Sequence, residues 1–328
     1  MKILLLTPAP PGSLAGNRAT ADRWAGLLEA LGHRVTVGTN YDPGVARDAD
    51  LLIALHAWRS REAVTRWRDE QGRKPLIVAL TGTDLYRFQY SHRQQTLATM
   101  AQGDALVVLH RLAWQAVPEP LRARLVVVLQ SAAAPVEAPR PAGSGEGFDI
   151  CVIGHLREEK DPLRAARASR LLPPGSAVRI RQAGQAHTGE WAQAARQEMA
   201  DNPRYQWLGE TSRAQTARLM RQSRAMVISS TMEGGANVVS EACRAGLPVL
   251  ASDIPGNLGL LGENYPGVFP VADEAALAAL MTRAENDQDW LAGLTARVNE
   301  LAADFTPEKE RAALAQALDR ALALSPAG

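Results

Sequence analysis

The sequence predicts an α/β protein made of two doubly wound domains, each built around a parallel sheet. Its 328 residues are about twice the length of a typical domain. Short aliphatic runs alternate along the chain with segments of helical periodicity. Residues 132–147 are rich in Ala, Pro and Gly, interrupt this alternation once and are predicted to be a linker. The predicted organisation is a first domain at 1–131, a second at 148–305 and a last helix at 306–328.

The first domain begins with a predicted buried strand at residues 3–6, where four aliphatic residues follow one another. An apolar helix stripe comes next, formed by Trp24, Leu27, Leu28 and Leu31. Further strands are predicted at 35–37, 51–55, 76–80, 105–109 and 125–129. These runs lack polar alternation, which is typical of strands that helices cover on both faces. The first half is therefore predicted to be a Rossmann-like domain.

The same alternation starts again after the linker. Strands are predicted at 150–153, 178–180, 226–228 and 248–250, and helices at 163–172, 211–222 and 237–245. The last helix begins with Thr306 and Pro307, a cap followed by a proline in the first turn. Its stripe is predicted to contain Leu314, Leu318 and Leu322. We expect a second Rossmann-like domain and a C-terminal helix that packs back on the first.

Composition excludes several classes of protein. The net charge of +1 argues against a nucleic-acid-binding protein or a polybasic membrane protein. The apolar start at 3–6 is too short for a signal peptide, and no run approaches the roughly 20 residues of a membrane helix. Cys151 and Cys243 are too few for a disulfide framework and are expected to be buried. We expect a cytoplasmic protein with no nucleic-acid partner and no stable membrane association.

Residues 226–242 read as a strand, a glycine turn and the start of a helix. Gly234 and Gly235 permit a tight turn, and the free N–H groups at the following helix start suit a phosphate. Asn237 and Glu241 are four residues apart and share one face of that helix. A carboxylate there can accept hydrogen bonds from a ribose diol. Glu241 alone would more simply be a surface residue, but this combination predicts a nucleotide site.

Glu233 and Glu241, with seven residues between them, match the E-x7-E element of retaining GT-B glycosyltransferases of the glycogen-synthase-like and family-4 type. Residues 241–252 also resemble that family's E-A-x-A-x-G-x-P-V-x-x-S stretch. The resemblance implies the GT-B fold, in which two Rossmann-like domains face a cleft. It implies that Glu241 binds the nucleotide ribose and that Glu233 lies beside the donor sugar. The backbone implied to meet the diphosphate or the sugar is that of Gly234, Gly235, Ala236 and Asn237.

A second phosphate element follows the strand at 150–153. The family typically shows Gly-Arg-Leu and then a lysine five residues after that arginine; Lys160 matches, but His155 replaces the arginine. Either Arg157 supplies the missing charge or His155 serves as a donor. Fixed cations here would stabilise the departing diphosphate without a metal. A solvated charge cluster is the simpler alternative, but lysine is rare in this chain, which favours a function for Lys160.

Two weaker motifs also follow strands of the second domain. Gly184 and Gly209 fall where the base-binding loops of the family lie, although glycine after a strand is common. Residues 253–257 either close over the sugar or form an ordinary turn.

Polar clusters follow the strands of the first domain as well. The loop at 8–18 is not G-x-G-x-x-G, which argues against a nicotinamide dehydrogenase. The resemblance implies that this loop, with Gly16, approaches the donor phosphates. Recurring arginines would suit an anionic acceptor, although arginine is also the default cation of this chain. The predicted acceptor-binding residues are Asn17, Arg18, Arg59, Thr83, Asp84 and Arg87. The residues predicted to take part in catalysis are Lys160, Glu233, Arg157 and His56.

The segments GNRATADRW, ALHAWRS, LTGTDLYR and GHLREEKDP are similar to a bacterial subgroup that includes the selenosugar synthases of selenoneine biosynthesis. That resemblance implies transfer of the glycosyl group of UDP-N-acetylglucosamine or UDP-glucose to selenophosphate, with release of UDP and without cofactor or metal. The alternatives are a glycosyltransferase that makes an O- or S-glycoside, and a non-catalytic sugar-nucleotide-binding protein. The latter could lose Lys160 and Glu233, so their presence favours an enzyme. The preferred sugar, the product anomer and the oligomeric state stay open.

Overall fold

The computed structural model describes residues 1–13, 16–133 and 147–324, which form two compact units. Unit 1 contains Met1–Ser131, Glu233–Gly235 and the chain from Pro307 onward. Unit 2 contains Ala132–Met232 and Ala236–Thr306. Most of the linker predicted at 132–147 lies outside the described residues.

Unit 1 contains a six-stranded parallel sheet in the order β2-β1-β3-β4-β5-β6. Its strands are β1 (Lys2–Leu6), β2 (Arg34–Gly38), β3 (Leu51–Leu55), β4 (Leu76–Leu80), β5 (Ala105–Val108) and β6 (Leu125–Val127). Every residue of β3 and β4 is buried, as expected for strands covered on both faces. The strand runs seen in the sequence are therefore confirmed, and all these strands end at the same edge.

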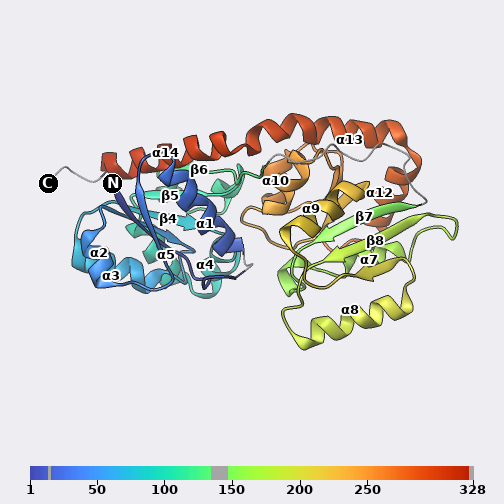
Figure 1. Cartoon of the computed structure of the whole chain (residues 1–328), viewed down its shortest axis with the longest axis horizontal. Coiled ribbons are helices and arrows are strands. Elements are labelled where there is room, and N and C mark those ends of the chain that lie inside the picture. Colours follow the sequence, from blue (N-terminus) through green and yellow to red (C-terminus); the bar gives the residue numbers. More distant parts are fainter. Residues whose placement is uncertain (14–15, 134–146, 325–328) are drawn as a thin grey trace. The chain divides into compact units, whose positions relative to one another are not determined.

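Two helices far apart in sequence cover one face of this sheet (Figure 1). They are α1 (Gly16–Glu29) and α14 (Pro307–Leu324). Trp24 of α1 and Leu314 and Leu318 of α14 pack in one apolar cluster with the strands, which confirms that the C-terminal helix packs on the first domain. Leu322 is 40% exposed, and Ala321 takes its expected place in the stripe because the helix has 3.6 residues per turn.

Shorter helices cover the other face of the sheet in unit 1. They are α2 (Pro43–Asp48), α3 (Arg61–Gln71), the π-helical turn η1 (Asp84–Phe88), α4 (Gln89–Ser91), α5 (Arg93–Gln102), the 3-10 turn η2 (Ala113–Gln115) and α6 (Glu119–Arg122). Trp67 of α3 and Met100 of α5 are fully buried in the apolar cluster on this face.

Unit 2 contains a second six-stranded parallel sheet, in the order β12-β11-β10-β7-β8-β9. Its strands are β7 (Phe148–Ile153), β8 (Val178–Ala183), β9 (Tyr205–Trp207), β10 (Ala225–Ile228), β11 (Val249–Ser252) and β12 (Val268–Phe269). The edge strands β9 and β12 were not predicted: Gln206 interrupts the apolar pattern of β9, and the two residues of β12 are too few to form a recognisable run.

Helices and short turns connect the strands of unit 2 or follow its last strand. They are η3 (Glu158–Lys160), α7 (Arg164–Ser169), α8 (Gly189–Asp201), α9 (Arg213–Gln222), α10 (Asn237–Arg244), α11 (Pro255–Leu261), α12 (Glu274–Asn286), α13 (Gln288–Leu301) and η4 (Ala302–Phe305). Local sequence explains several helix starts: Ser212 and Gln215 form a capping box for α9, and Asp273 caps α12. Within the described residues, none of the helices has the length and apolarity to cross a bilayer.

Candidate active site

The ends of β7 and β10 bring two of the predicted site residues together in unit 2. His155 and Lys160 line one small pocket, which also includes Gly154 and Ser229. The aliphatic part of Lys160 lies close to Gly154, where its Cδ would be 3.9 Å from a Cβ on that glycine. Two residues that sequence motifs singled out are therefore neighbours in space, at the edge where parallel sheets bind ligands.

The backbone of the Lys160 turn is held from β10. The Ser229 hydroxyl donates hydrogen bonds to the carbonyl oxygens of Asp161 (2.9 Å) and Lys160 (3.2 Å). The Thr231 amide donates to the Glu159 carbonyl (2.9 Å). The residues that directly follow β10 thereby fix the position of η3 and of the Lys160 backbone.

Arg157, the alternative to His155, lies half-buried just before η3. Its Nε is 3.9 Å from a carboxylate oxygen of Glu159. His155 lines the Lys160 pocket, whereas Arg157 is not among the described residues that line it. This placement favours His155 as the neighbour of Lys160. The diphosphate roles of both residues stay predictions.

Glycines allow three loops of unit 2 to lie side by side. The Gly184 amide, after β8, donates to the Gly209 carbonyl, after β9 (2.8 Å). Gly184 has φ of +149°, and a Cβ there would overlap the carbonyl oxygen of Gly154. Gly184 is therefore needed for this packing at the sheet edge, and Gly209 takes part in it through its carbonyl. The predicted role of both glycines near a base stays a prediction.

Helix α10 begins where the glycine turn predicted it. Its first residue is Asn237 and its N-cap is Ala236. Val239 and Ala242 are buried, and Glu241 is exposed on the other side.

The two glutamates of the E-x7-E element belong to different units, Glu233 to unit 1 and Glu241 to unit 2. Glu233 is 9% exposed. Gly234 packs so tightly within unit 1 that a Cβ would overlap the backbone of Thr81 and Gly82. Glycine is therefore required at 234 by close backbone packing, while the predicted nucleotide and sugar roles of this turn stay predictions.

In unit 1, His56 follows β3 in a left-handed conformation with φ of +73°. Its Nδ1 accepts the Arg59 amide (3.3 Å), so Nε2 carries the proton and donates to the Thr83 hydroxyl oxygen (2.9 Å). Burial lowers the pKa of His56, an effect that Asp84 opposes and Arg59 reinforces. The ring is therefore neutral at pH 7, and both of its nitrogens are engaged.

Asp84, in the turn after β4, is fully buried and organises the loops around His56. Its carboxylate accepts hydrogen bonds from the amides of Thr81 and Gly82 in its own turn (both 2.9 Å). It also accepts the amide of Ala57, after β3 (2.9 Å). Backbone donors thus occupy this carboxylate, so any effect of Asp84 on an acceptor is exerted through the shape of these loops.

The remaining predicted residues of unit 1 differ in their surroundings. Arg59 is exposed beside His56, and Arg87 lies half-buried on η1. Arg18 is paired with Asp22 one turn further along α1 (2.7 Å). Gly16 and Asn17 form the start of the same helix. The Arg18 pair weakens its case as an anion ligand, because Asp22 already neutralises its charge.

Sequence reasoning missed a hydrogen-bonded pair in unit 1. His110 follows β5 with its Nε2 2.7 Å from the Tyr86 hydroxyl, and burial lowers the pKa of His110 to about 4. Burial also raises the pKa of the Tyr86 phenol. A histidine directly after an aliphatic strand is the available signal in the sequence, but it does not show which residue the histidine contacts.

Sequence reasoning also missed Gln182 on β8, which lines the Lys160 pocket and is 1% exposed. Its Oε1 accepts the Tyr205 hydroxyl (2.7 Å). An isolated glutamine within a strand carries no distinctive sequence signal, because only the packed sheet shows which face it occupies.

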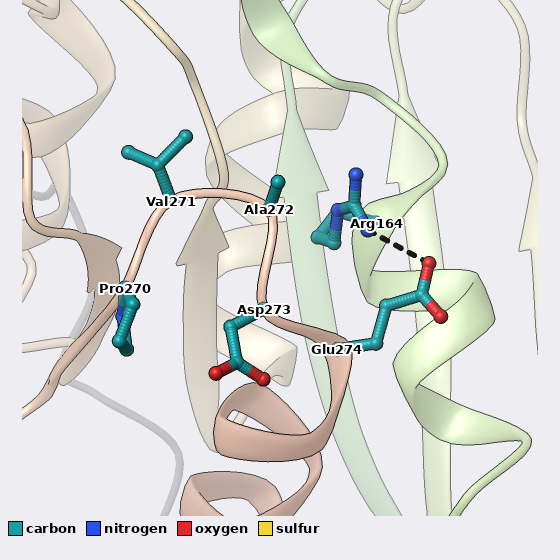
Figure 2. Close-up of a pocket in the computed structure, with 6 residues that line it drawn as sticks. All are labelled: Arg164, Pro270, Val271, Ala272, Asp273 and Glu274. Carbon is teal, nitrogen blue, oxygen red and sulfur yellow. Dashed lines mark hydrogen bonds and ion pairs between the residues drawn. The ribbon is translucent and has the colours of Figure 1, made fainter.

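A second pocket in unit 2, of about 490 Å³, lies beside the start of α12 and includes Arg164 (Figure 2). Arg164 points toward Glu274 and forms an ion pair with it (2.8 Å). Neither residue was singled out from the sequence.

The chain belongs to the family described as glycosyl transferases group 1, whose model matches residues 137–305. HepE from Anabaena resembles it with a TM-score of 0.77 at 17% identity, covering 97% of this chain and 99% of that one. Sucrose-phosphate synthase from Thermosynechococcus elongatus gives a TM-score of 0.76 at 16% identity, covering 99% and 100%. A glycosyltransferase from Rickettsia africae gives 0.74 at 14% identity, covering 98% of each chain. None of the curated proteins matches the sequence.

These findings confirm the GT-B fold that the E-x7-E resemblance implied, with two units that each carry a parallel sheet and flanking helices. They also confirm that the protein is an enzyme, a glycosyltransferase.

Proposed function

We propose that this glycosyltransferase moves the glycosyl group of a UDP-sugar, UDP-N-acetylglucosamine or UDP-glucose, to selenophosphate and releases UDP. The main support for a UDP-sugar donor is that His155 and Lys160 line one pocket at the sheet edge of unit 2. HepE, which has the same fold, was solved in complex with UDP and with UDP-glucose. Both observations support a nucleotide-sugar donor.

In the proposed donor site, each polar group meets one part of the nucleotide sugar. The Lys160 ammonium and the His155 ring bind the diphosphate, and Glu241 accepts hydrogen bonds from the ribose. When the sugar–phosphate bond breaks, negative charge grows on the departing UDP, and fixed positive groups stabilise it. The proposed reaction uses no metal and no cofactor.

In the proposed acceptor site, unit 1 supplies hydrogen-bond donors and positive charge. Thr83 accepts a hydrogen bond from His56, so its own hydroxyl hydrogen is directed elsewhere and can be donated to an acceptor oxygen. The exposed guanidinium of Arg59 adds positive charge near His56. His56 thus acts by orienting Thr83, since its engaged ring nitrogens leave it no site for abstracting a proton.

This set of groups suits an acceptor that is already anionic and nucleophilic, as selenophosphate is. A selenium lone pair forms the new bond to the anomeric carbon. The anomeric carbon–oxygen bond breaks, and its electron pair leaves with UDP. No proton has to move, so the buried and fully bonded carboxylate of Asp84 is not required as a base.

The test is the release of UDP from each of the two UDP-sugars, with and without selenophosphate, combined with mass spectrometry of the product. We expect release to require selenophosphate and the product to contain selenium bound to the sugar. Equal release with and without selenophosphate would contradict the acceptor. Release that requires an alcohol or thiol instead would establish an O- or S-glycoside product.

Variants separate the two halves of the proposal. Lys160→Ala is expected to reduce turnover about 100-fold, with Lys2→Ala on the exposed end of β1 as the matched control. Glu241→Ala should weaken UDP binding measured by calorimetry. Arg59→Ala should raise the KM for selenophosphate and leave UDP affinity unchanged. If Lys160→Ala turns over at the wild-type rate, the donor site is assigned wrongly.

A further inference from the structure

Arg164, the first residue of α7, makes two charged contacts from a half-buried position. Its Nη1 donates to a carboxylate oxygen of Glu274 (2.8 Å), as Figure 2 shows. Its Nε donates to a carboxylate oxygen of Asp161 (2.7 Å). The side chains of Arg164 and Asp161 are both 15% exposed. Charge-assisted hydrogen bonds of this length fix the geometry of the groups that they join.

The first partner of Arg164 directly follows Lys160 in the chain. Asp161 adopts the left-handed conformation, with φ of +42° and ψ of 59°, which residues other than glycine rarely adopt. Such a conformation persists where surrounding contacts hold it in place. Ser229 holds the Asp161 carbonyl, and Arg164 holds the Asp161 side chain. The backbone turn that orients Lys160 is therefore held from two sides.

The second partner anchors Arg164 to another element. Glu274 is the first residue of α12, whose N-cap Asp273 accepts the Ala276 amide (2.8 Å). Helices α12 and α7 pack against each other within unit 2. Arg164 thus connects a well-capped helix start to the turn after Lys160.

Arg164 is not among the described residues that line the Lys160 pocket. Its contact with the Lys160 turn is the hydrogen bond to Asp161. We propose that Arg164 is a positioning residue, which holds the turn at Asp161 so that Lys160 faces the donor diphosphate. The inference rests on the proposed donor site and names a residue that acts on it indirectly.

The test is a double-mutant cycle on UDP binding, measured by calorimetry with the full-length chain. We expect Arg164→Ala to weaken UDP affinity about tenfold, because a misplaced cation loses most of its contact with the diphosphate. Lys160→Ala should weaken it by at least as much. The double variant should bind UDP no more weakly than Lys160→Ala alone, because Arg164 acts only through Lys160.

The matched control is Arg170→Ala, which removes an ion pair from the other end of α7. Arg170 donates to both carboxylate oxygens of Glu198 (2.8 and 2.9 Å). Both arginine variants should lower the melting temperature similarly, and only Arg164→Ala should change UDP affinity. Glu274→Gln removes the charge that anchors Arg164 but keeps Arg164 itself, so it should weaken UDP binding less than Arg164→Ala does. This variant replaces Arg164→Ala in the test if Arg164→Ala does not fold.

The possible outcomes distinguish this inference from the proposed function. Wild-type affinity in Arg164→Ala and Glu274→Gln, or additive losses in the double variant, would overturn the positioning role alone. Failure of the wild-type protein to bind UDP, or wild-type affinity in Lys160→Ala, would overturn the donor site itself.

Discussion

His56 and His110 are buried just after the ends of β3 and β5, and burial lowers the pKa of both rings. A neutral imidazole carries one donor nitrogen and one acceptor nitrogen, so each ring can fix the direction of its hydrogen bonds. His56 uses this property to orient the hydroxyl of Thr83. These residues contribute geometry, whereas the charge in unit 1 comes from exposed arginines such as Arg59.

His110 is expected to make stability depend on pH. Its pKa is about 4 in the folded protein against 6.5 for an unperturbed histidine, so the unfolded chain binds more protons between these pH values. The stability that depends on neutral His110 is fully present above pH 6.5 and is lost as pH falls toward 4, by up to about 3 kcal/mol.

His110→Gln tests this dependence, because glutamine stays neutral at every pH. The free energy of unfolding is measured by urea denaturation of both proteins between pH 7 and pH 4.5. The advantage of the wild type over the variant should shrink as pH falls. A difference that stays constant over this range would show that His110 does not titrate as inferred.

Both cysteines are buried and free, as the sequence predicted. Burial raises the pKa of Cys151 and of Cys243 to about 12, so little reactive thiolate is present at pH 8. We expect iodoacetamide to leave both thiols unmodified in the native protein and to modify both in urea, as followed by mass spectrometry. Modification of the native protein at the rate of an exposed thiol would contradict this.

At the scale of elements, the loops after β7, β8 and β9 depend on close backbone approach. Gly184 combines a φ of +149° with a position where a Cβ would overlap the Gly154 carbonyl oxygen. A glycine after a strand was visible in the sequence, but its neighbour was not, because the two loops are brought together only by strand pairing.

Gly184→Ala should therefore destabilise unit 2 by about 2 kcal/mol or more and weaken UDP binding. Gly189→Ala is the matched control, because a Cβ at this first residue of α8 meets open space. Chemical denaturation and calorimetry measure the two effects. Equal stability of the two variants would mean that the loop accommodates a side chain.

At the scale of the whole molecule, Glu310 joins parts of unit 1 that are far apart in the chain. Its carboxylate, on α14, is buried and pairs with Arg23 of α1 (2.9 Å). It also accepts hydrogen bonds from the Trp24 indole (2.8 Å) and from the Ser131 amide (2.8 Å). Helix α14 is thereby attached to α1 and to Ser131, the last residue of the first chain segment of unit 1.

Glu310→Ala should lower the free energy of unfolding of unit 1 by about 3 kcal/mol, because it removes a buried carboxylate that accepts from Arg23, the Trp24 indole and the Ser131 amide. Hydrogen exchange of peptides from β1 to β6 measures this change. Glu308→Ala, in the same turn but exposed, should have little effect. Protection of the unit 1 strands that is unchanged in Glu310→Ala would contradict the anchoring role.

Local sequence predicted the elements whose formation depends on near neighbours. Aliphatic runs predicted β3, β4 and most other strands, and the glycine turn at Gly234 and Gly235 predicted the start of α10. The edge strands β9 and β12 were missed because their two or three residues do not form a recognisable aliphatic run, and only pairing with β8 and β11 shows that they are strands. Of the candidate site, the motif positions His155 and Lys160 were predicted, whereas Arg164 and Gln182 were not, because no local pattern distinguishes them.

The sequence by itself determined the fold class and which loops carry polar side chains, because periodicity and turn residues act over a few positions. Only the tertiary structure decided which polar groups meet. Glu310 is 287 residues away from Arg23, and Glu274 is 110 residues away from Arg164. Buried polar groups must find partners, and packing rather than sequence distance brings those partners within hydrogen-bonding reach.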